Sequence, residues 1–193
     1  MTTAVPQLTV QRYDASGLHE HRDELLTVYA EVYADRLDDP FFSLPRYWER
    51  LEAYGQRDGF TLVTGRLDGE LVGYALGYTL PAGSRWWQGL RQDVEPSVLE
   101  ESGQRTFALT EIMVQENRRR QGYARALHDA LIQDRAEERA TLLVLPENVP
   151  ARSAYLSWGW YKLGELQPFA DAPVYDAMML ELRTDKQDAP FDE

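Results

Sequence analysis

The chain has 193 residues, 44% of them hydrophobic, so it can bury one sizeable core and is expected to form one domain. Acidic residues outnumber basic ones by 32 to 20, and the net charge of −12 favours cationic or neutral partners over nucleic acid. The absence of cysteine excludes disulfides, thiol nucleophiles and cysteine-based zinc sites. No secretory signal begins the chain and no apolar run approaches the ~20 residues that cross a bilayer, so a cytoplasmic protein without a membrane partner is expected.

Hydrophobic periodicity predicts the elements of the first half of the chain. Alternating apolar and polar residues indicate strands, whereas apolar residues three and four apart indicate helices. Asp68-Gly69 between two alternating runs is a strong hairpin signal, and Ser43 with Pro45 marks a helix start. The expected order is a loose end at 1–6, a strand over 8–13, a turn over 14–17, a helix over 18–37, a helix over 43–56, and strands over 60–67 and 70–80.

Two aromatic stretches lie before residue 105. Phe41 and Phe42 stand between the first two predicted helices, and Trp86 and Trp87 lie in a long connection over 81–103, with a short helix expected near its end. A connection longer than ~15 residues in a compact domain is usually functional or mobile. For both stretches, contact with a substrate and packing against the core are open alternatives.

The most basic stretch of this acidic chain lies at a predicted strand–helix junction. Residues 107–114 are apolar and short enough for a strand, and a helical period begins at Tyr123. A helix N-terminus presents unpaired N–H groups and partial positive charge, and Gly122 and Ala124 are small enough for a bulky anion to approach the backbone. The arginines around this junction are Arg118, Arg119, Arg120 and Arg125. The stretch predicts a polyphosphate site, and a solvated basic turn is the alternative.

The last part of the chain alternates again between strand and helix signals. Pro150 suits the first turn of a helix and Gly159 its end. Strands are expected over 140–146, 160–166 and 174–182. The polar, acidic residues that follow, over 184–193, are expected to be disordered.

One motif at the basic junction resembles a known family. Arg119-x-x-Gly122-x-Ala124, five residues after Val114, is similar to the acyl-CoA pyrophosphate loop of the GNAT-type N-acetyltransferases, with Ala at the variable last position. Neither a Walker-type loop nor a dinucleotide-binding fingerprint is present.

A second motif supports the same resemblance. Asn148, Ala151, Tyr155 and Gly159 are in register with the family's Asn-x-x-Ala-x-x-x-Tyr signature and the Gly-Phe that follows it, although Trp160 replaces the usual Phe. The two motifs occur in the family's order and separation. The chain therefore resembles a GNAT protein from residue 8 to residue 182.

The resemblance implies an α/β fold, the GNAT acyl-CoA N-acyltransferase fold. Its central sheet is mixed, mostly antiparallel and of about seven strands, flanked by about four helices. It implies a single domain over 1–183, acetyl-CoA as co-substrate and no metal. Both a monomer and a homodimer are compatible with the sequence.

The resemblance also implies roles for single residues. Tyr155 is expected to act as general acid toward the CoA sulfur or to hydrogen-bond the developing thiolate, and the Val114 N–H to bond the thioester oxygen. Glu111 is expected either to be the general base or to be a structural partner of an arginine. The residues expected to bind the cofactor are Ile112, Met113, Val114, Arg119, Arg120, Gln121, Gly122, Tyr123, Ala124 and Asn148. Those expected to contact the acceptor are Phe41, Phe42, Trp86 and Trp87.

The function implied is direct transfer of an acetyl group to a primary amine. Because the chain is acidic, a cationic small molecule is the expected acceptor. A peptide or protein N-acetyltransferase and a non-catalytic acyl-CoA-binding module are the alternatives.

Overall fold

The computed structural model describes residues 7–170 and 172–182. The expected loose end at 1–6 and tail at 184–193 lie outside these residues. In chain order the elements are β1 (Thr9–Tyr13), α1 (Ala15–Glu20), α2 (Arg22–Val32), α3 (Leu44–Gly55), β2 (Thr61–Leu67), β3 (Glu70–Thr79), α4 (Pro96–Leu99), β4 (Thr106–Val114), the short 3-10 helix η1 (Glu116–Arg118), α5 (Tyr123–Ile132), β5 (Arg139–Val144), α6 (Val149–Ser157), β6 (Tyr161–Leu166) and β7 (Tyr175–Glu181).

The chain folds into two compact units that share β4. The first unit comprises Met1–Thr79 and Leu109–Asp134, and the second comprises Leu80–Ala108 and Arg135–Glu193. The strands form one mixed sheet in the order β1-β2-β3-β4-β5-β7-β6. The expectation of a mixed α/β fold with about seven strands is confirmed, whereas the expectation of a single domain stays a prediction.

Two antiparallel pairings build the sheet of the first unit, between β1 and β2 and between β2 and β3. The hairpin between β2 and β3 turns at Asp68 and Gly69, whose φ angles of 50° and 87° are those of the left-handed region. Asp and Gly both tolerate this region, which explains why this dipeptide predicts the hairpin correctly.

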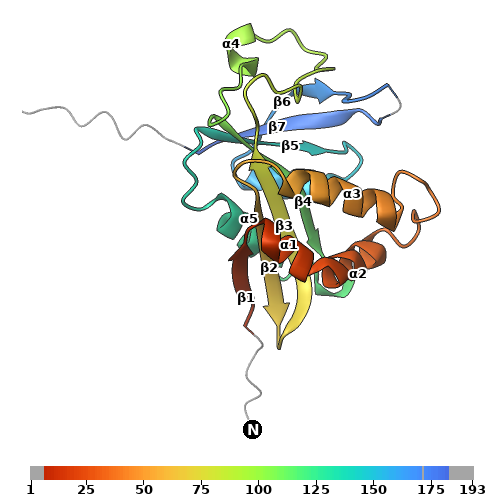
Figure 1. The fold of residues 1–193 in the computed structure, drawn as a ribbon. Coiled ribbons are helices and arrows are strands. Elements are labelled where there is room, and N and C mark those ends of the chain that lie inside the picture. Colours follow the sequence, from red (N-terminus) through yellow and green to blue (C-terminus); the bar gives the residue numbers. More distant parts are fainter. Residues whose placement is uncertain (1–6, 171, 183–193) are drawn as a thin grey trace, which may run out of the picture. The chain divides into compact units, whose positions relative to one another are not determined.

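The two faces of this sheet carry different helices. Leu62 and Tyr74 face a core that α1, α2 and α3 cover, while Gly65 and Gly73 face Leu127 of α5 (Figure 1). The two glycines pair with each other across β2 and β3. Because neither has a side chain, Leu127 approaches the sheet closely, and α5 is held against it.

The predicted helix over 18–37 is wrong in its boundaries. Helix formation begins earlier, at Ala15, because the Asp14 carboxylate accepts hydrogen bonds from the Ser16 N–H and hydroxyl at 2.9 and 2.6 Å and so caps α1. The helical run is divided at His21, and α2 ends at Val32. The residues from 33 to 42 form turns. Together with the single turn of α4, this division gives six α-helices within the described part of the chain, where about four were expected.

In the second unit, β4 pairs with β5 in parallel through its first residues, and β7 pairs antiparallel with both β5 and β6. Trp87, Leu166 and Met179 belong to its apolar core. A buried ion pair joins Arg139 of β5 to Glu101, at 3.0 Å. This pair links the end of the long connection to the sheet of this unit.

Candidate functional site

Strand β4 carries a carboxylate into the core of the first unit. Met113 is buried and accepts a hydrogen bond from the Tyr74 hydroxyl at 3.3 Å. Glu111 lies two residues earlier, so strand alternation places it on the same face, opposite to Ile112 and Val114. The side chain is half-buried, and burial raises the pKa of Glu111 to about 7, while the nearby Arg50 guanidinium acts in the opposite direction. A carboxyl with such a pKa changes its charge near neutral pH, as a general base for an amine must.

Three tyrosines lie beside this carboxyl. The Tyr47 and Tyr74 hydroxyls are 2.7 Å apart and both side chains are buried, and the Tyr29 ring stacks on the Tyr47 ring with centroids 3.6 Å apart. Burial, and after it the negative charge of Glu111, raises the pKa of Tyr47 and of Tyr74 well above the usual value. These phenols therefore stay protonated, and their single donors are engaged, Tyr74 to the Met113 sulfur and Tyr47 to the Tyr74 hydroxyl.

The sequence does not predict Tyr47, Tyr74 or Arg50 as neighbours of Glu111. Tyr47 and Arg50 have the three-residue spacing of one helix face, but nothing in the sequence orients α3 toward β4. In the sequence, nothing distinguishes these three tyrosines from any other tyrosine of a core. Their association with a carboxylate is decided by packing.

The loop after β4 is held by hydrogen bonds at its start. The Glu31 carboxylate accepts from the Gln115 side chain at 3.1 Å and from the Glu116 N–H at 3.2 Å, and the Arg119 side chain donates to the Val114 carbonyl at 3.4 Å. These contacts of Glu31 in α2 and of Arg119 in the loop fix the path of the chain directly after β4.

The same loop then takes a constrained backbone path into α5. Arg120 and Gly122 have φ angles of 61° and 83°, and an arginine in this region is uncommon. A Cβ built on Gly122 would meet no atom within 4 Å, so the space beside this residue, directly before α5 begins at Tyr123, is open. The first-turn N–H groups of α5 have no partner within the helix. Nearby, the Arg118 Nε is buried without a hydrogen-bond partner among the described residues.

The second motif lies in the second unit. The Asn148 side chain caps α6 by accepting from the Ala151 N–H at 3.4 Å. Tyr155 is 7% exposed, and its ring contacts those of Trp158 and Trp160 with centroids 5.6 and 5.9 Å away. The large ring at position 160, where the family has Phe, thus packs beside the tyrosine. The structure therefore groups Glu111, residues 112–114 and residues 119–124 in the first unit, and Asn148 and Tyr155 in the second.

The four aromatic residues expected near an acceptor have different surroundings. Phe41 and Phe42 are half-buried and pack edge to face at 5.1 Å in the segment between α2 and α3. Trp87 is 6% exposed and donates from its indole nitrogen to Glu101 at 2.8 Å, and Trp86 packs against the same core. Packing and the bond to Glu101 account for Trp87, whereas the Trp86 indole nitrogen is buried without a hydrogen-bond partner among the described residues. The two phenylalanines keep exposed surface.

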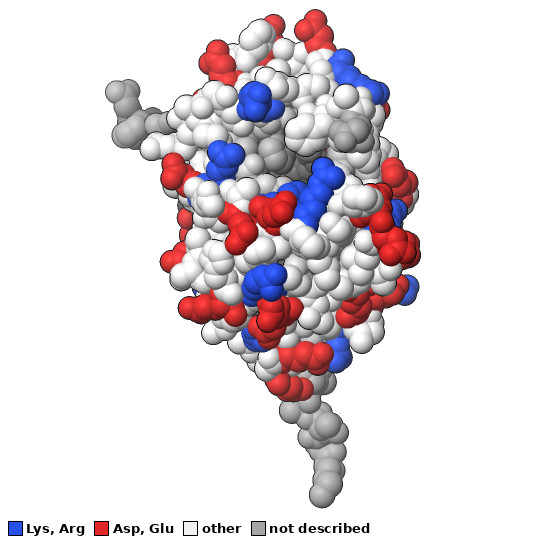
Figure 2. Space-filling model, turned by 45° about the vertical axis from the view of Figure 1, so that its right-hand side comes forward, with Lys and Arg blue, Asp and Glu red and all other residues white. Residues whose placement is uncertain are grey.

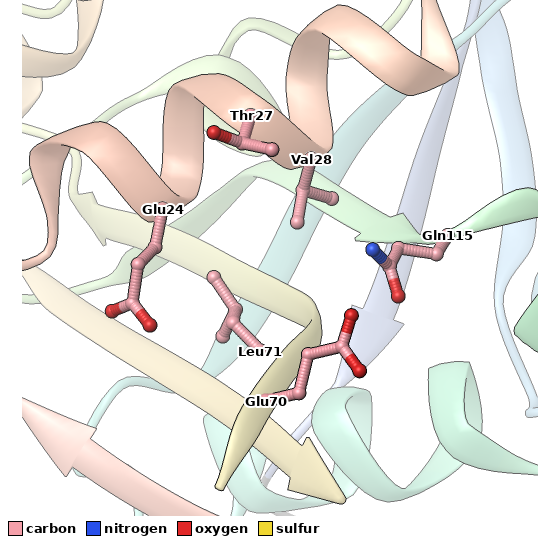
Figure 3. Close-up of a pocket in the computed structure, with 6 residues that line it drawn as sticks. All are labelled: Glu24, Thr27, Val28, Glu70, Leu71 and Gln115. Carbon is pink, nitrogen blue, oxygen red and sulfur yellow. The ribbon is translucent and has the colours of Figure 1, made fainter.

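A separate hollow of about 170 Å³ lies in the first unit, lined by Glu24, Thr27, Val28, Glu70, Leu71 and Gln115 (Figure 3). Its Glu24 carboxylate is bound by Arg66 through two hydrogen bonds, at 2.6 and 2.7 Å, which lower the pKa of Glu24. The hollow contains none of the residues expected in the site, and one of its two carboxylates is already neutralised.

None of the described helices is long and apolar enough to cross a membrane. Between residues 7 and 182, position 171 aside, there is no group of three or more His, Asp or Glu side chains that could hold a metal ion.

The fold is a mixed sheet whose fourth strand leads through an arginine-rich loop into the N-terminus of a helix. The family model described as the acetyltransferase (GNAT) family matches residues 24–160, more than half of the chain. The protein therefore belongs to the GNAT family and is an acyltransferase. No curated protein matches the chain.

Solved structures of this family share the fold at low sequence identity. A GNAT-family protein from Desulfovibrio desulfuricans is 18% identical, with a TM-score of 0.62 over 92% of this chain and 100% of that one. Diaminobutyrate acetyltransferase from Paenibacillus lautus, solved with L-2,4-diaminobutyric acid and coenzyme A, is 15% identical, with a TM-score of 0.59 over 94% and 99%. A ribosomal-protein-alanine N-acetyltransferase from Brucella melitensis is 22% identical, with a TM-score of 0.50 over 79% and 90%. The last two have acceptors of different kinds, so the shared fold does not select between them.

Proposed function

We propose that this protein transfers an acetyl group from acetyl-CoA directly to a primary amine of a small molecule. The observation that carries the proposal is Glu111, a half-buried carboxyl with a pKa of about 7 on the strand that leads into the arginine-rich loop. Burial of a carboxylate without a compensating partner is unfavourable, and acids with strongly shifted pKa values are concentrated at functional sites.

The loop after β4 is proposed to hold the pyrophosphate of acetyl-CoA. Arg118, Arg119 and Arg120 have no carboxylate within ion-pair distance among the described residues, although the chain is strongly acidic. Their charges, the buried Arg118 Nε and the open space at Gly122 before α5 together suit an anion with several oxygens. Within the same loop Gln121, Tyr123 and Ala124 are proposed to contribute backbone N–H groups. Ile112, Met113 and Val114 are proposed to pair with the extended arm of the cofactor and Asn148 to contact it.

The proposed reaction has one nucleophilic attack, one proton transfer to Glu111 and one stabilising contact from Tyr155 to the leaving sulfur. The amine nitrogen attacks the thioester carbon, and Glu111 accepts the proton that the nitrogen loses. The carbon–sulfur bond then breaks, and the departing thiolate accepts a hydrogen bond or a proton from Tyr155. Because a phenol is usually less acidic than a thiol, with pKa values near ~10 and ~8.5, Tyr155 acts mainly as a hydrogen-bond donor.

The acceptor pocket is proposed to lie against Phe41 and Phe42, which keep exposed surface beside α3. Trp86 and Trp87 stay a prediction as acceptor contacts; Trp87 is held by core packing and by Glu101, and the buried Trp86 indole nitrogen has no hydrogen-bond partner among the described residues. The expectation of a cationic acceptor rests on the net charge of the whole chain. The arginines nearest to the two phenylalanines favour instead an acceptor that is not purely cationic.

The test is a panel of amines, amino acids and peptides, followed by release of free thiol from acetyl-CoA. We expect a small primary amine to be acetylated, and Tyr155→Phe to lower turnover by ~100- to 10,000-fold while acetyl-CoA binding and folding persist. A panel in which only peptides react would replace the proposal by a peptide N-acetyltransferase. Acetyl-CoA binding without transfer to any amine would support a binding module.

A further inference from the structure

Three arginines of the first unit lie against aromatic rings instead of carboxylates. Arg36 stands 5.3 Å from the centre of the Phe42 ring, and Arg46 and Arg50 stand 4.9 and 5.1 Å from that of Phe41. Within the part of the chain that the structure describes, none of the three has a carboxylate at ion-pair distance. This arrangement is unexpected in a chain with a net charge of −12, where acidic partners are plentiful.

Arg50 is the most firmly held of the three. Its Nη1 donates to the Phe41 carbonyl at 3.0 Å, and its guanidinium also lies 5.4 Å from the centre of the buried Tyr47 ring. The side chain is half-buried, so part of it still reaches solvent. A cation that is fixed in this way loses little further conformational entropy when it binds an anion.

The contacts with the aromatic rings do not use the hydrogen-bond donors of Arg50. A guanidinium stacks on an aromatic ring through its face, whereas its five N–H donors point outward in its own plane. The Phe41 carbonyl uses one donor, and the guanidinium also acts on the Tyr29 hydroxyl, whose pKa it lowers against the larger effect of burial. The planar fork matches a carboxylate, with which it forms two parallel charge-assisted hydrogen bonds.

Arg50 is also close to the proposed general base. Its charge lowers the pKa of Glu111 against the larger effect of burial, and both residues belong to the first unit. A cationic body next to Arg50 would be repelled. Figure 2 shows acidic and basic side chains interspersed over the visible face. Because salt screens each charge, a ligand there is recognised through the few charged side chains directly next to it.

From these contacts we propose that the acceptor carries a carboxylate as well as its amine, and that Arg50 binds this carboxylate, with the exposed Arg46 as a secondary contact. The inference rests on the proposed function, because it deepens the same acceptor site. It predicts amino-acid-type acceptors, in which one molecule presents an amine toward Glu111 and an acid group toward Arg50.

The experiment compares two matched acceptors, a linear diamine and the same diamine with one carboxylate on a terminal carbon. Assays are run at pH 8.5, above the pKa of about 7 of Glu111, because Arg50→Gln removes a charge that lowers this pKa. We expect the wild type to prefer the carboxylated acceptor, and Arg50→Gln to raise its KM by roughly 10- to 100-fold. The KM of the plain diamine is expected to stay level or to fall, because a repelling charge is removed.

The controls separate recognition from damage to the fold. Arg57→Gln removes an exposed arginine just after α3 and should change neither KM, while Arg50→Lys should recover only part of the loss because lysine lacks the fork. Equal changes for the two acceptors in Arg50→Gln would overturn the inference and give Arg50 a structural role. A change confined to the KM of acetyl-CoA would overturn it in favour of a cofactor contact.

A binding measurement keeps the inference independent of turnover. Calorimetry with the carboxylated diamine in the absence of acetyl-CoA should show binding to the wild type and at least tenfold weaker binding to Arg50→Gln. If this difference is found but no amine is acetylated, the proposed function fails and carboxylate recognition stands. If amines are acetylated but this difference is absent, the proposed function stands and the inference fails.

Discussion

Replacing Glu111 by glutamine should weaken the enzyme and strengthen the fold. Glutamine keeps the shape of the side chain and removes its negative charge. Burial raises the pKa of Glu111 from 4.5 to about 7, and each pKa unit corresponds to about 1.4 kcal/mol. The ionised carboxylate therefore destabilises the folded state by about 3 kcal/mol, and we expect about 2 kcal/mol because the side chain is only half-buried.

The sign of the pH dependence follows from the direction of this shift. Below pH 4.5 the carboxyl is protonated in the folded and the unfolded chain, and the glutamate carries no penalty. Between pH 4.5 and about 7 the unfolded chain releases the proton first, so this group lowers the free energy of unfolding as the pH rises. Above about 7 the penalty is complete. The advantage of Glu111→Gln should therefore grow from pH 5 to pH 8 and then level off.

The assay is denaturant unfolding of the wild type and Glu111→Gln at several pH values from 5 to 8.5. Glu20→Gln, which changes an exposed acid on α1, is the matched control and should show no such trend. Turnover is measured on the same samples. It should fall most near neutral pH and partly return toward the pKa of the amine, because a deprotonated amine needs the base less.

A variant that is less stable than the wild type at every pH would refute this reasoning. It would mean that the charge of Glu111 is favourable in the folded state, as expected of a structural partner of Arg50. A flat loss of activity across the pH range would point to the same structural role.

Three further predictions concern the cofactor loop, the sheet and the buried ion pair. Gly122→Glu should remove the thermal stabilisation by acetyl-CoA, which at ~100 times the dissociation constant is about 2.7 kcal/mol in the wild type; a full shift in the variant would refute the loop assignment. Gly73→Ala places a Cβ 2.5 Å from the Met113 carbonyl oxygen, so it should displace β4, lower the free energy of unfolding by about 1–3 kcal/mol and weaken acetyl-CoA binding; unchanged binding by calorimetry would contradict this. Glu101→Gln leaves the Arg139 charge buried without its partner and should cost about 3–5 kcal/mol in denaturant unfolding; a change below 1 kcal/mol would show that the pair is not needed.

The sequence predicts the strands to within one or two residues and the family correctly, because these depend on local signals. The hairpin at Asp68 and Gly69 follows from residues that tolerate a left-handed backbone. The loop at Gly122 follows from three spaced residues, and the family match over residues 24–160 confirms the resemblance. Alternation along β4 is enough to place Glu111 on the face opposite to Val114.

What lies around Glu111 is decided only by the tertiary structure. Hydrophobic spacing shows that α3 has a buried face, but it does not say which strand that face meets, so Tyr47 and Arg50 cannot be assigned to Glu111 in advance. The same limit applies to the end of the helix expected to reach residue 37, since the chain past Val32 is held in turns by contacts within the core. The charge of the whole chain predicts a cationic acceptor, whereas the packing of Arg50 on Phe41 creates a positive site at one place. Net charge is a sum over all residues, but recognition depends on the few that packing brings together.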